Sequence, residues 1–243
     1  MPLGAFWEAY EAPGFHYLDR LHLDRLQIPP NRVAQIWANE RRGAIHENLP
    51  PQPFYGNLHT ARCYLLFGNP AARERDYEEA DAQRFAEYWH QQLQMLHGAQ
   101  VGFLPLSPIG EQLSAGFYWR RVFRRLLACI FAVRANAVLE NHYQDLLPHM
   151  CVIEANAYSS RRRPHEENDA FPSSVATRQF VQTELRDRAE NGNARILVWR
   201  RQDFWNLAPG HNVMVRDPQR AQLPFLREVE RDFLRAELMP LLR

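Results

Sequence analysis

The feature that most constrains the fold is a short apolar run, residues 63–67, that stops abruptly at Gly68-Asn69-Pro70. A brief apolar run bounded by Gly and Pro is typical of a buried β-strand. In an open α/β sheet, ligands bind outside the carboxyl ends of such strands. We therefore expect Asn69 to lie at the mouth of a crevice, where Pro70 fixes the direction in which the chain leaves.

Similar apolar runs follow along the chain, and helical patterns separate them. Residues 150–155, 195–199 and 212–215 are predicted strands, and residues 100–106 are a shorter candidate. Strands that alternate with helices favour an α/β fold, here a three-layer α/β/α arrangement around a mostly parallel sheet of four to five strands. The predicted helices are residues 78–96, 117–133, 135–146, 175–190 and 225–242.

The N-terminal part of the chain predicts additional helices outside this sheet. We expect residues 1–48 to form a helical extension packed on the core, and residues 49–243 to form the α/β domain. Between them, residues 49–57 are rich in Pro and cannot continue a helix, so they predict an ordered loop that leads into the first strand.

Composition excludes several classes of protein. The net charge is +1, and every one of the 29 basic residues is Arg, so nucleic-acid binding would need a local patch. No apolar run is long enough to span a bilayer, and the N-terminus lacks a basic leader, which predicts a cytoplasmic protein without membrane contact. Cys63, Cys129 and Cys151 are widely spaced in apolar surroundings, which predicts buried thiols.

No cofactor or metal is predicted. The histidines form no HxxxH or HxH arrangement, and the cysteines form no CxxC pair, so the sequence offers no zinc or iron–sulfur ligand set. No strand is followed by a P-loop or a GxGxxG turn, and no serine lies in a GxSxG elbow. These absences disfavour nucleotide triphosphate enzymes, dinucleotide enzymes and serine hydrolases of that type.

Two predicted strands end in an amide side chain, Asn69 after the first and Asn156 after the strand at residues 150–155. If these strands are neighbours in the sheet, both amides face one crevice. A carboxamide offers one acceptor and two donors, which can match the edge of a nucleobase. Each Asn can equally well cap the turn that follows its strand.

The segment Gly68-Asn69-Pro70, preceded by residues 53–57 (PFYGN), resembles the first active-site motif of the uracil-DNA glycosylase-like superfamily. The resemblance implies DNA or another nucleobase-containing ligand as partner. It also implies that Asn69 is catalytic and positions the attacking water, with Gly68 and Pro70 beside the substrate, and that Asn156 reads the base. The chain has GNPA where the family has a Gly-x-Asn-Pro-Gly type of turn.

The family's late motif, a His-Pro-Ser type of turn, corresponds to residues 215–220, which keep the Pro and lack the His. Arg216 and Arg220 in this segment are candidates to neutralise a phosphate or a departing anionic base. The aromatic residue that stacks on the base is predicted to be Tyr77 or Phe103, and Tyr77 has the alternative role of capping a helix.

Glu154 lies inside a strand that we expect to be buried, so its carboxylate needs a partner or a raised pKa. It could pair with an Arg as a structural bridge, or it could act in the site. Alternation along a strand places Glu154 and Asn156 on the same face, which keeps the second role open.

A run of hydroxyl and basic side chains follows the same strand, at Ser159, Ser160, Arg161 and Arg162. At the rim of a crevice this run suits phosphate contacts, and it is also compatible with a solvated charge run. The arginines at 120, 121, 124 and 125 predict a solvated helix face. The expected function is a glycosylase that cleaves an N-glycosidic bond, or alternatively a non-catalytic nucleic-acid-binding or interaction protein on the same fold.

Overall fold

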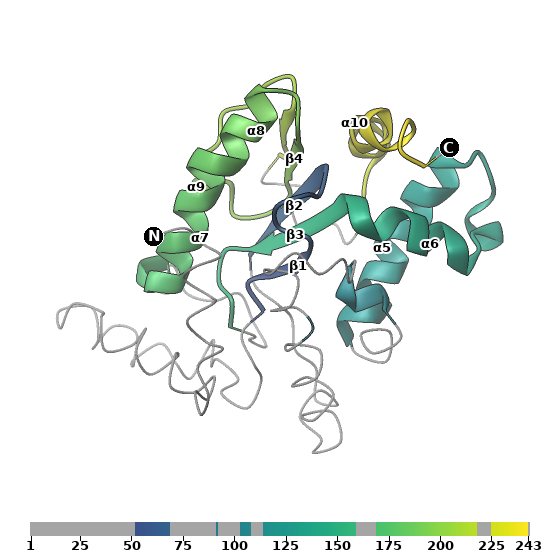
Figure 1. Ribbon diagram of the computed structural model, residues 1–243, viewed down its shortest axis with the longest axis horizontal. Coiled ribbons are helices and arrows are strands. Elements are labelled where there is room, and N and C mark those ends of the chain that lie inside the picture. Colours follow the sequence, from purple (N-terminus) through teal and green to yellow (C-terminus); the bar gives the residue numbers. More distant parts are fainter. Residues whose placement is uncertain are drawn as a thin grey trace, which may run out of the picture.

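The computed structural model describes residues 52–68, 91, 103–107, 114–158, 169–217 and 225–242. At its centre is a five-stranded sheet with the strand order β1-β3-β2-β4-β5 (Figure 1). Strands β2 to β5 run parallel to one another, and β1 pairs antiparallel with β3 at one edge. The strands are β1 (Phe54–Gly56), β2 (Cys63–Phe67), β3 (Met150–Glu154), β4 (Arg195–Val198) and β5 (Val213–Val215).

The direction in which the chain winds across the sheet reverses at β2. This strand pairs with β3 on one side and with β4 on the other, and the chain forms β3 before it crosses back to β4. In open α/β sheets such a reversal opens a crevice at the carboxyl ends of the strands that flank it. The residues that follow β2 and β4 are therefore the candidates to line such a crevice.

Helices cover both faces of the sheet, with α5, α6 and α10 on one side and α7, α8 and α9 on the other (Figure 1). Side chains alternate between the faces, so Leu65 packs with the first group of helices and Leu66 with the second. The α/β prediction is confirmed. The helices are α5 (Ser114–Ile130), α6 (Glu140–Leu146), α7 (Pro172–Phe180), α8 (Arg186–Glu190), α9 (Gln202–Trp205) and α10 (Glu228–Leu238).

Short non-α segments complete the described helical structure. A π-helical turn, Val181–Leu185, joins α7 to α8 without a break, and the predicted helix at residues 175–190 corresponds to this whole unit. The predicted helix at residues 135–146 divides into a 3-10 turn, Ala135–Ala137, and α6. Another 3-10 turn, Leu147–His149, leads into β3.

Two sequence predictions need correction. Of the strand expected at residues 100–106 the structure describes residues 103–106, where Leu104–Leu106 form a 3-10 turn, because Pro105 has no N–H to give to a sheet. The Pro-rich loop expected at residues 49–57 contains β1. Its Gly56 has φ +94°, and a Cβ atom there would lie 2.1 Å from the carbonyl oxygen of Met150, so only Gly allows β1 to approach β3 this closely.

The predicted N-terminal helical extension (residues 1–48) lies outside the described residues, and so does nearly all of the predicted helix at residues 78–96. None of the helices that the structure describes combines the length and the apolar character needed to cross a membrane.

Candidate functional site

The two strands that were predicted to end in amides are neighbours at the centre of the sheet. Phe67 at the end of β2 pairs with Glu154 at the end of β3, and the backbone N–H of Asn156 donates to the carbonyl of Gly68 over 2.9 Å. The carboxyl ends of both strands therefore meet at one edge, which we call the carboxyl edge. Asn69 itself lies outside the described residues.

The side chain of Asn156 is fully buried, and the oxygen of its amide already has a hydrogen-bond partner. Its Oδ1 accepts a hydrogen bond from the backbone N–H of Tyr158 at 2.9 Å, so the predicted turn-capping role is observed. The amide nitrogen Nδ2 is buried and has no hydrogen-bond partner. A buried donor without a partner costs about 1–3 kcal/mol. What Asn156 has left to offer is a donor, suited to an oxygen acceptor.

Glu154 is also buried at this edge, with 3% of its surface exposed. Its Oε2 has no hydrogen-bond partner, and no ion pair with a described arginine satisfies it, so the predicted structural bridge is not observed within this part of the chain. Burial raises the pKa of Glu154 to about 8, while the nearby charge of Arg200 partly opposes this. The carboxyl group is therefore largely protonated at neutral pH and can donate as well as accept.

Two residues from other elements approach Glu154. Tyr118 in α5 has a buried hydroxyl without a hydrogen-bond partner. Its pKa is raised by burial, lowered in part by Arg200, and raised further by Glu154. The Arg200 guanidinium, directly after β4, lies 5.7 Å from the ring centre of Phe67. A carboxyl, a phenol and a guanidinium from β3, α5 and the end of β4 thus gather at the carboxyl edge.

Arg201 borders the same edge from the other side. It adopts a left-handed backbone conformation with φ 58°, and its side chain forms an ion pair with Asp169, close before α7. Its Nη1 is buried without a hydrogen-bond partner. A Cβ atom on Gly68 would lie 3.4 Å from Arg201 Cγ, so the Gly leaves room for this side chain. In the first turn of α7, the hydroxyls of Ser173 and Ser174 are likewise buried and unpartnered.

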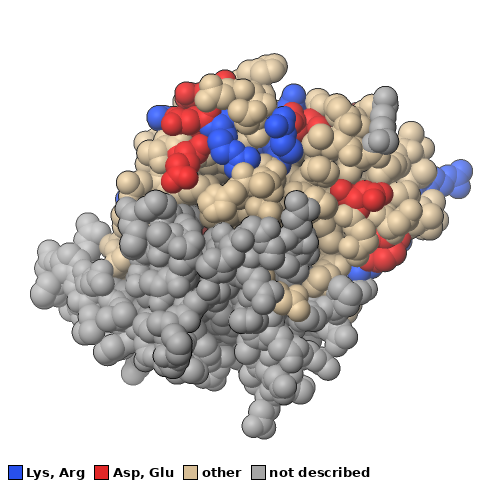
Figure 2. Space-filling view, viewed as in Figure 1, with Lys and Arg blue, Asp and Glu red and all other residues tan. Residues whose placement is uncertain are grey.

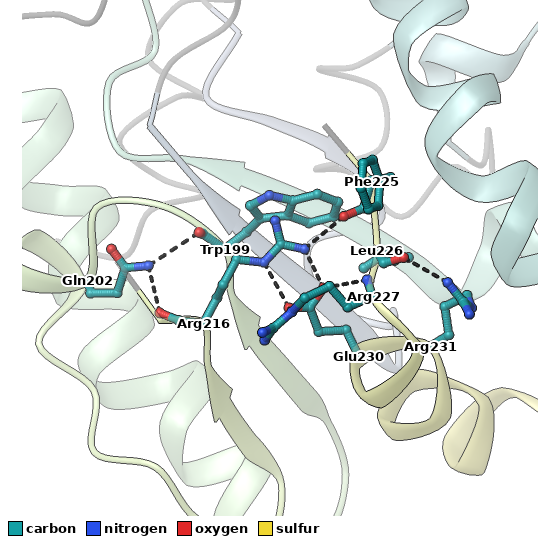
Figure 3. Close-up of polar contacts among 8 residues, drawn as sticks. All are labelled: Trp199, Gln202, Arg216, Phe225, Leu226, Arg227, Glu230 and Arg231. Carbon is teal, nitrogen blue, oxygen red and sulfur yellow. Dashed lines mark hydrogen bonds and ion pairs between the residues drawn. The ribbon is translucent and has the colours of Figure 1, made fainter. Parts of the chain in front are cut away.

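The side chain of Arg216 is fully buried, so it is not exposed for the contact with a phosphate or a departing base that the sequence suggested. Figure 3 shows its guanidinium against the indole of Trp199, at 3.9 Å from the ring centre. Two of its nitrogens form hydrogen bonds. Nε donates to Glu230 Oε1 over 2.8 Å, and Nη2 donates to Glu230 Oε2 and to the carbonyl oxygen of Phe225. This arginine joins β5 to α10.

Phe103, a candidate to stack on a base, is packed inside the core instead. It is fully buried in the core beneath α5, where its ring centre lies 5.6 Å from that of Trp119 and 5.3 Å from that of Phe123. The signal that suggested a stacking role, an aromatic residue in a short apolar segment, is equally typical of core packing. The predicted site residues outside the described part of the chain are Asn69, Pro70, Tyr77, Ser159, Ser160, Arg161, Arg162 and Arg220.

The sequence analysis missed Tyr118, Arg200, Arg201 and the two serines of α7. For Arg200 and Arg201 a signal was available, because they follow a predicted strand just as Asn156 does. Tyr118 could not be found this way, since only tertiary packing brings α5 to the edge of the sheet. For Ser173 and Ser174 the available signal was the preceding Pro172, a typical first residue of a helix, which places both serines in the first helical turn.

A separate cavity of about 780 Å³ lies at the opposite end of the sheet, beside the start of β5. The π-helical turn contributes Gln182 and Thr183 to its wall, α8 contributes Arg186 and Glu190, and the loop at residues 206–212 closes it. The ion pair between Arg186 and Glu190, 3.5 Å apart, leaves this wall with charges of both signs. None of the residues predicted from the sequence lines this cavity.

Among the described residues, no group of three His, Cys, Asp or Glu side chains is placed to hold a metal ion. Comparison with protein-family models, curated proteins and solved structures found no match for this chain.

Proposed function

We propose that the carboxyl edge recognises a nucleobase, and that the protein cleaves the N-glycosidic bond of that base in the manner of the uracil-DNA glycosylase-like superfamily. The observation that carries the proposal is the pair of unpartnered groups at the end of β3, the Nδ2 of Asn156 and the Oε2 of Glu154, beside Gly68. Buried polar groups are nearly always hydrogen-bonded, so two neighbouring groups without partners indicate a ligand that completes their hydrogen bonds.

The hydrogen-bonding capacity of this pair suits an oxo-base. The unpartnered Nδ2 of Asn156 offers N–H donors, which match an acceptor such as an exocyclic carbonyl oxygen, while its Oδ1 already accepts from Tyr158. A protonated Glu154 both donates and accepts, which complements the adjacent N–H and C=O of a lactam edge. Uracil and hypoxanthine carry such an edge, whereas an exocyclic amino group would face a donor at Asn156.

Cleavage would develop negative charge on the departing base and positive charge on the sugar. Donors aimed at the base stabilise that charge, and this is the role of Asn156. The resemblance assigns to Asn69 the positioning of the attacking water. An amide does not accept the proton of that water as a carboxylate would, so we expect a slow enzyme. A base in DNA must first leave the stack, at a cost of a few kcal/mol.

The test is the release of free base from uracil- and hypoxanthine-containing oligonucleotides. We expect Asn156→Ala and Asn69→Ala to lower the release rate by about tenfold or more, while Asn193→Ala, at an exposed turn, serves as the matched control. Normal oligonucleotide binding without release of any base would contradict the proposed cleavage.

A second candidate is a protein that recognises nucleic acid at this edge without cleaving it. The sequence favours it in two respects, since position 69 is an Asn rather than a carboxylate and residues 215–220 contain no His. In that case the oligonucleotides bind, no base is released, and Asn156→Ala weakens binding alone.

A further inference from the structure

The outer face of α5 carries an unusual charge distribution. The helix, SAGFYWRRVFRRLLACI, holds arginines at 120, 121, 124 and 125 and contains no Asp or Glu. Trp119, Val122 and Phe123 are buried against the sheet, as are Leu126 and Leu127 one turn later. The helical period therefore turns the arginines away from the core, where Arg121, Arg124 and Arg125 are exposed.

Most of this positive charge has no acidic partner among the residues that the structure describes. Arg120 pairs with Glu140 of α6 at 2.7 Å. Arg124 donates to the carbonyl oxygen of Ala135, and Arg125 lies over the ring of Phe225, so both are oriented without meeting an acid. Within the described part of the chain, Arg121, Arg124 and Arg125 form no ion pair. By contrast, Figure 2 shows blue and red side chains intermingled over α8, where Arg186 pairs with Glu190.

An exposed aromatic residue lies in line with these arginines. Phe117 is 54% exposed although it is a large apolar side chain, and it precedes Arg121 by one helical turn. The first turns of α5 also reach the carboxyl edge, because Trp119 packs against Phe67 with ring centres 5.0 Å apart and Tyr118 lies near Glu154. The cationic face thus begins beside the candidate site and continues along the helix.

We propose that the outer face of α5 binds single-stranded nucleic acid, with Arg121, Arg124 and Arg125 on the phosphates and Phe117 stacked on a base. Guanidinium forks match phosphate oxygens, and a cationic track combined with an exposed aromatic ring is how proteins hold single strands. This proposal rests on the proposed function in one respect only, namely that the bound single-stranded nucleic acid runs towards the carboxyl edge. The binding itself requires no cleavage.

The test is fluorescence anisotropy of the full-length protein with a labelled 20-nucleotide oligothymidine and with a duplex of the same length, over a salt series. The variant Arg121→Gln/Arg124→Gln/Arg125→Gln should bind the single strand at least about tenfold more weakly at 0.15 M salt, and the slope of log affinity against log salt should shrink by about 2. Phe117→Ala should weaken single-strand binding by about fivefold or more.

The matched control is Arg178→Gln/Arg186→Gln/Arg231→Gln, which removes the same charge from other helices and should change the affinity by less than about twofold. An α5 variant that behaves like this control overturns the proposal, and so does a wild-type protein that binds no oligonucleotide at low salt. If the duplex binds more tightly and Phe117→Ala has no effect, the assignment to single strands is wrong. Competition by polyglutamate as strong as that by oligothymidine would indicate an acidic protein partner instead.

These results are separable from those of the base-release assay. Binding through α5 without release of any base contradicts the proposed cleavage and leaves this inference intact. Release of base that the α5 variant retains in full, with unchanged oligonucleotide affinity, contradicts this inference alone.

Discussion

At the scale of single residues, the groups that set this protein apart are buried polar atoms without partners. Glu154, Asn156, Tyr118 and Arg201 each leave one such atom at the carboxyl edge. Sequence analysis predicted the burial of Glu154 from the apolar pattern of its strand, and it left open whether the strands that end before Asn69 and Asn156 are neighbours, because strand order depends on tertiary structure. It could not predict Tyr118, because that contact depends on where α5 packs.

Replacing Glu154 with Gln tests the protonation of this carboxyl. Its pKa in the folded protein is raised to about 8 from an ordinary value of 4.5, so the folded state holds a proton that the unfolded state loses as the pH rises between these values. The wild type therefore loses stability across that window. We expect Glu154→Gln to be more stable than the wild type at pH 8, by on the order of 3 kcal/mol, with no difference below pH 4.5.

The measurement is urea unfolding of both proteins at a series of pH values. A stability difference between wild type and Glu154→Gln that does not change between pH 4.5 and pH 8 would show that the carboxyl has an ordinary pKa.

Two glycines with positive φ give a matched pair for a test of close packing. At Gly56, with φ +94°, an added methyl group would meet the carbonyl oxygen of Met150 at 2.1 Å, so Gly56→Ala should destabilise the fold by ~3 kcal/mol or more. At Gly192, with φ +74°, nothing lies within 4 Å, so Gly192→Ala should cost only ~1 kcal/mol of backbone strain. Thermal unfolding compares the two, and equal costs would refute the close approach of β1 to β3.

At the scale of secondary structure, strands β2 to β5 and the longest described helices were predictable, and the edge strand β1 was not. The run at residues 63–67 became β2 because five consecutive buried side chains fit a strand covered on both faces. Strand β1 was hidden by the prolines that precede it at positions 50, 51 and 53, which argue against a central strand but are tolerated next to an edge strand. Helix α9, only four residues long, gave no periodic signal.

The buried pair of Arg216 and Glu230 connects two such elements, β5 and α10. Removal of one partner leaves an unpaired buried charge, so Glu230→Ala should lower the free energy of unfolding by about 3–5 kcal/mol. The double variant Arg216→Met/Glu230→Leu leaves no fully buried charge unpaired, and only the partly exposed Arg227 loses its ion pair, so it should regain much of that loss. Chemical denaturation of both variants is the measurement, and a double variant as unstable as Glu230→Ala would contradict this account.

The same pair predicts acid sensitivity. Burial raises the pKa of Glu230, but hydrogen bonds from Arg216 and Arg227 outweigh this and hold the pKa below its ordinary value of 4.5. A lowered pKa contributes stability above pH 4.5 that is lost as the pH falls through the folded value. Part of the decline in stability of the wild type in acid should therefore be absent in Arg216→Met/Glu230→Leu.

At the scale of the whole molecule, the sheet separates two cores, and each contains a buried thiol. Cys63 packs on the face of α5, and Cys151 packs on the face of α7. Burial raises the pKa of both thiols, which makes them unreactive in the folded state. Cys129 is only half-buried, so the prediction that all three thiols are buried is correct for two.

Thiol labelling therefore reports on the cooperativity of the molecule. In native buffer we expect Cys129 to react first, and Cys63 and Cys151 to react together at the rate of global unfolding. Mass spectrometry of the labelled peptides distinguishes the three sites. Labelling of Cys151 well before Cys63 would show that the layer of α7 and α8 opens independently of the rest.

The position of β2 has a consequence for synthesis of the chain. Both strands that pair with it, β3 at residues 150–154 and β4 at residues 195–198, are made later. Strand β2, whose five side chains are all buried in the folded protein, therefore leaves the ribosome without neighbours, and it stays unpaired until most of the polypeptide has been translated. Nascent chains that stall before residue 150 should depend on chaperones that bind exposed hydrophobic segments.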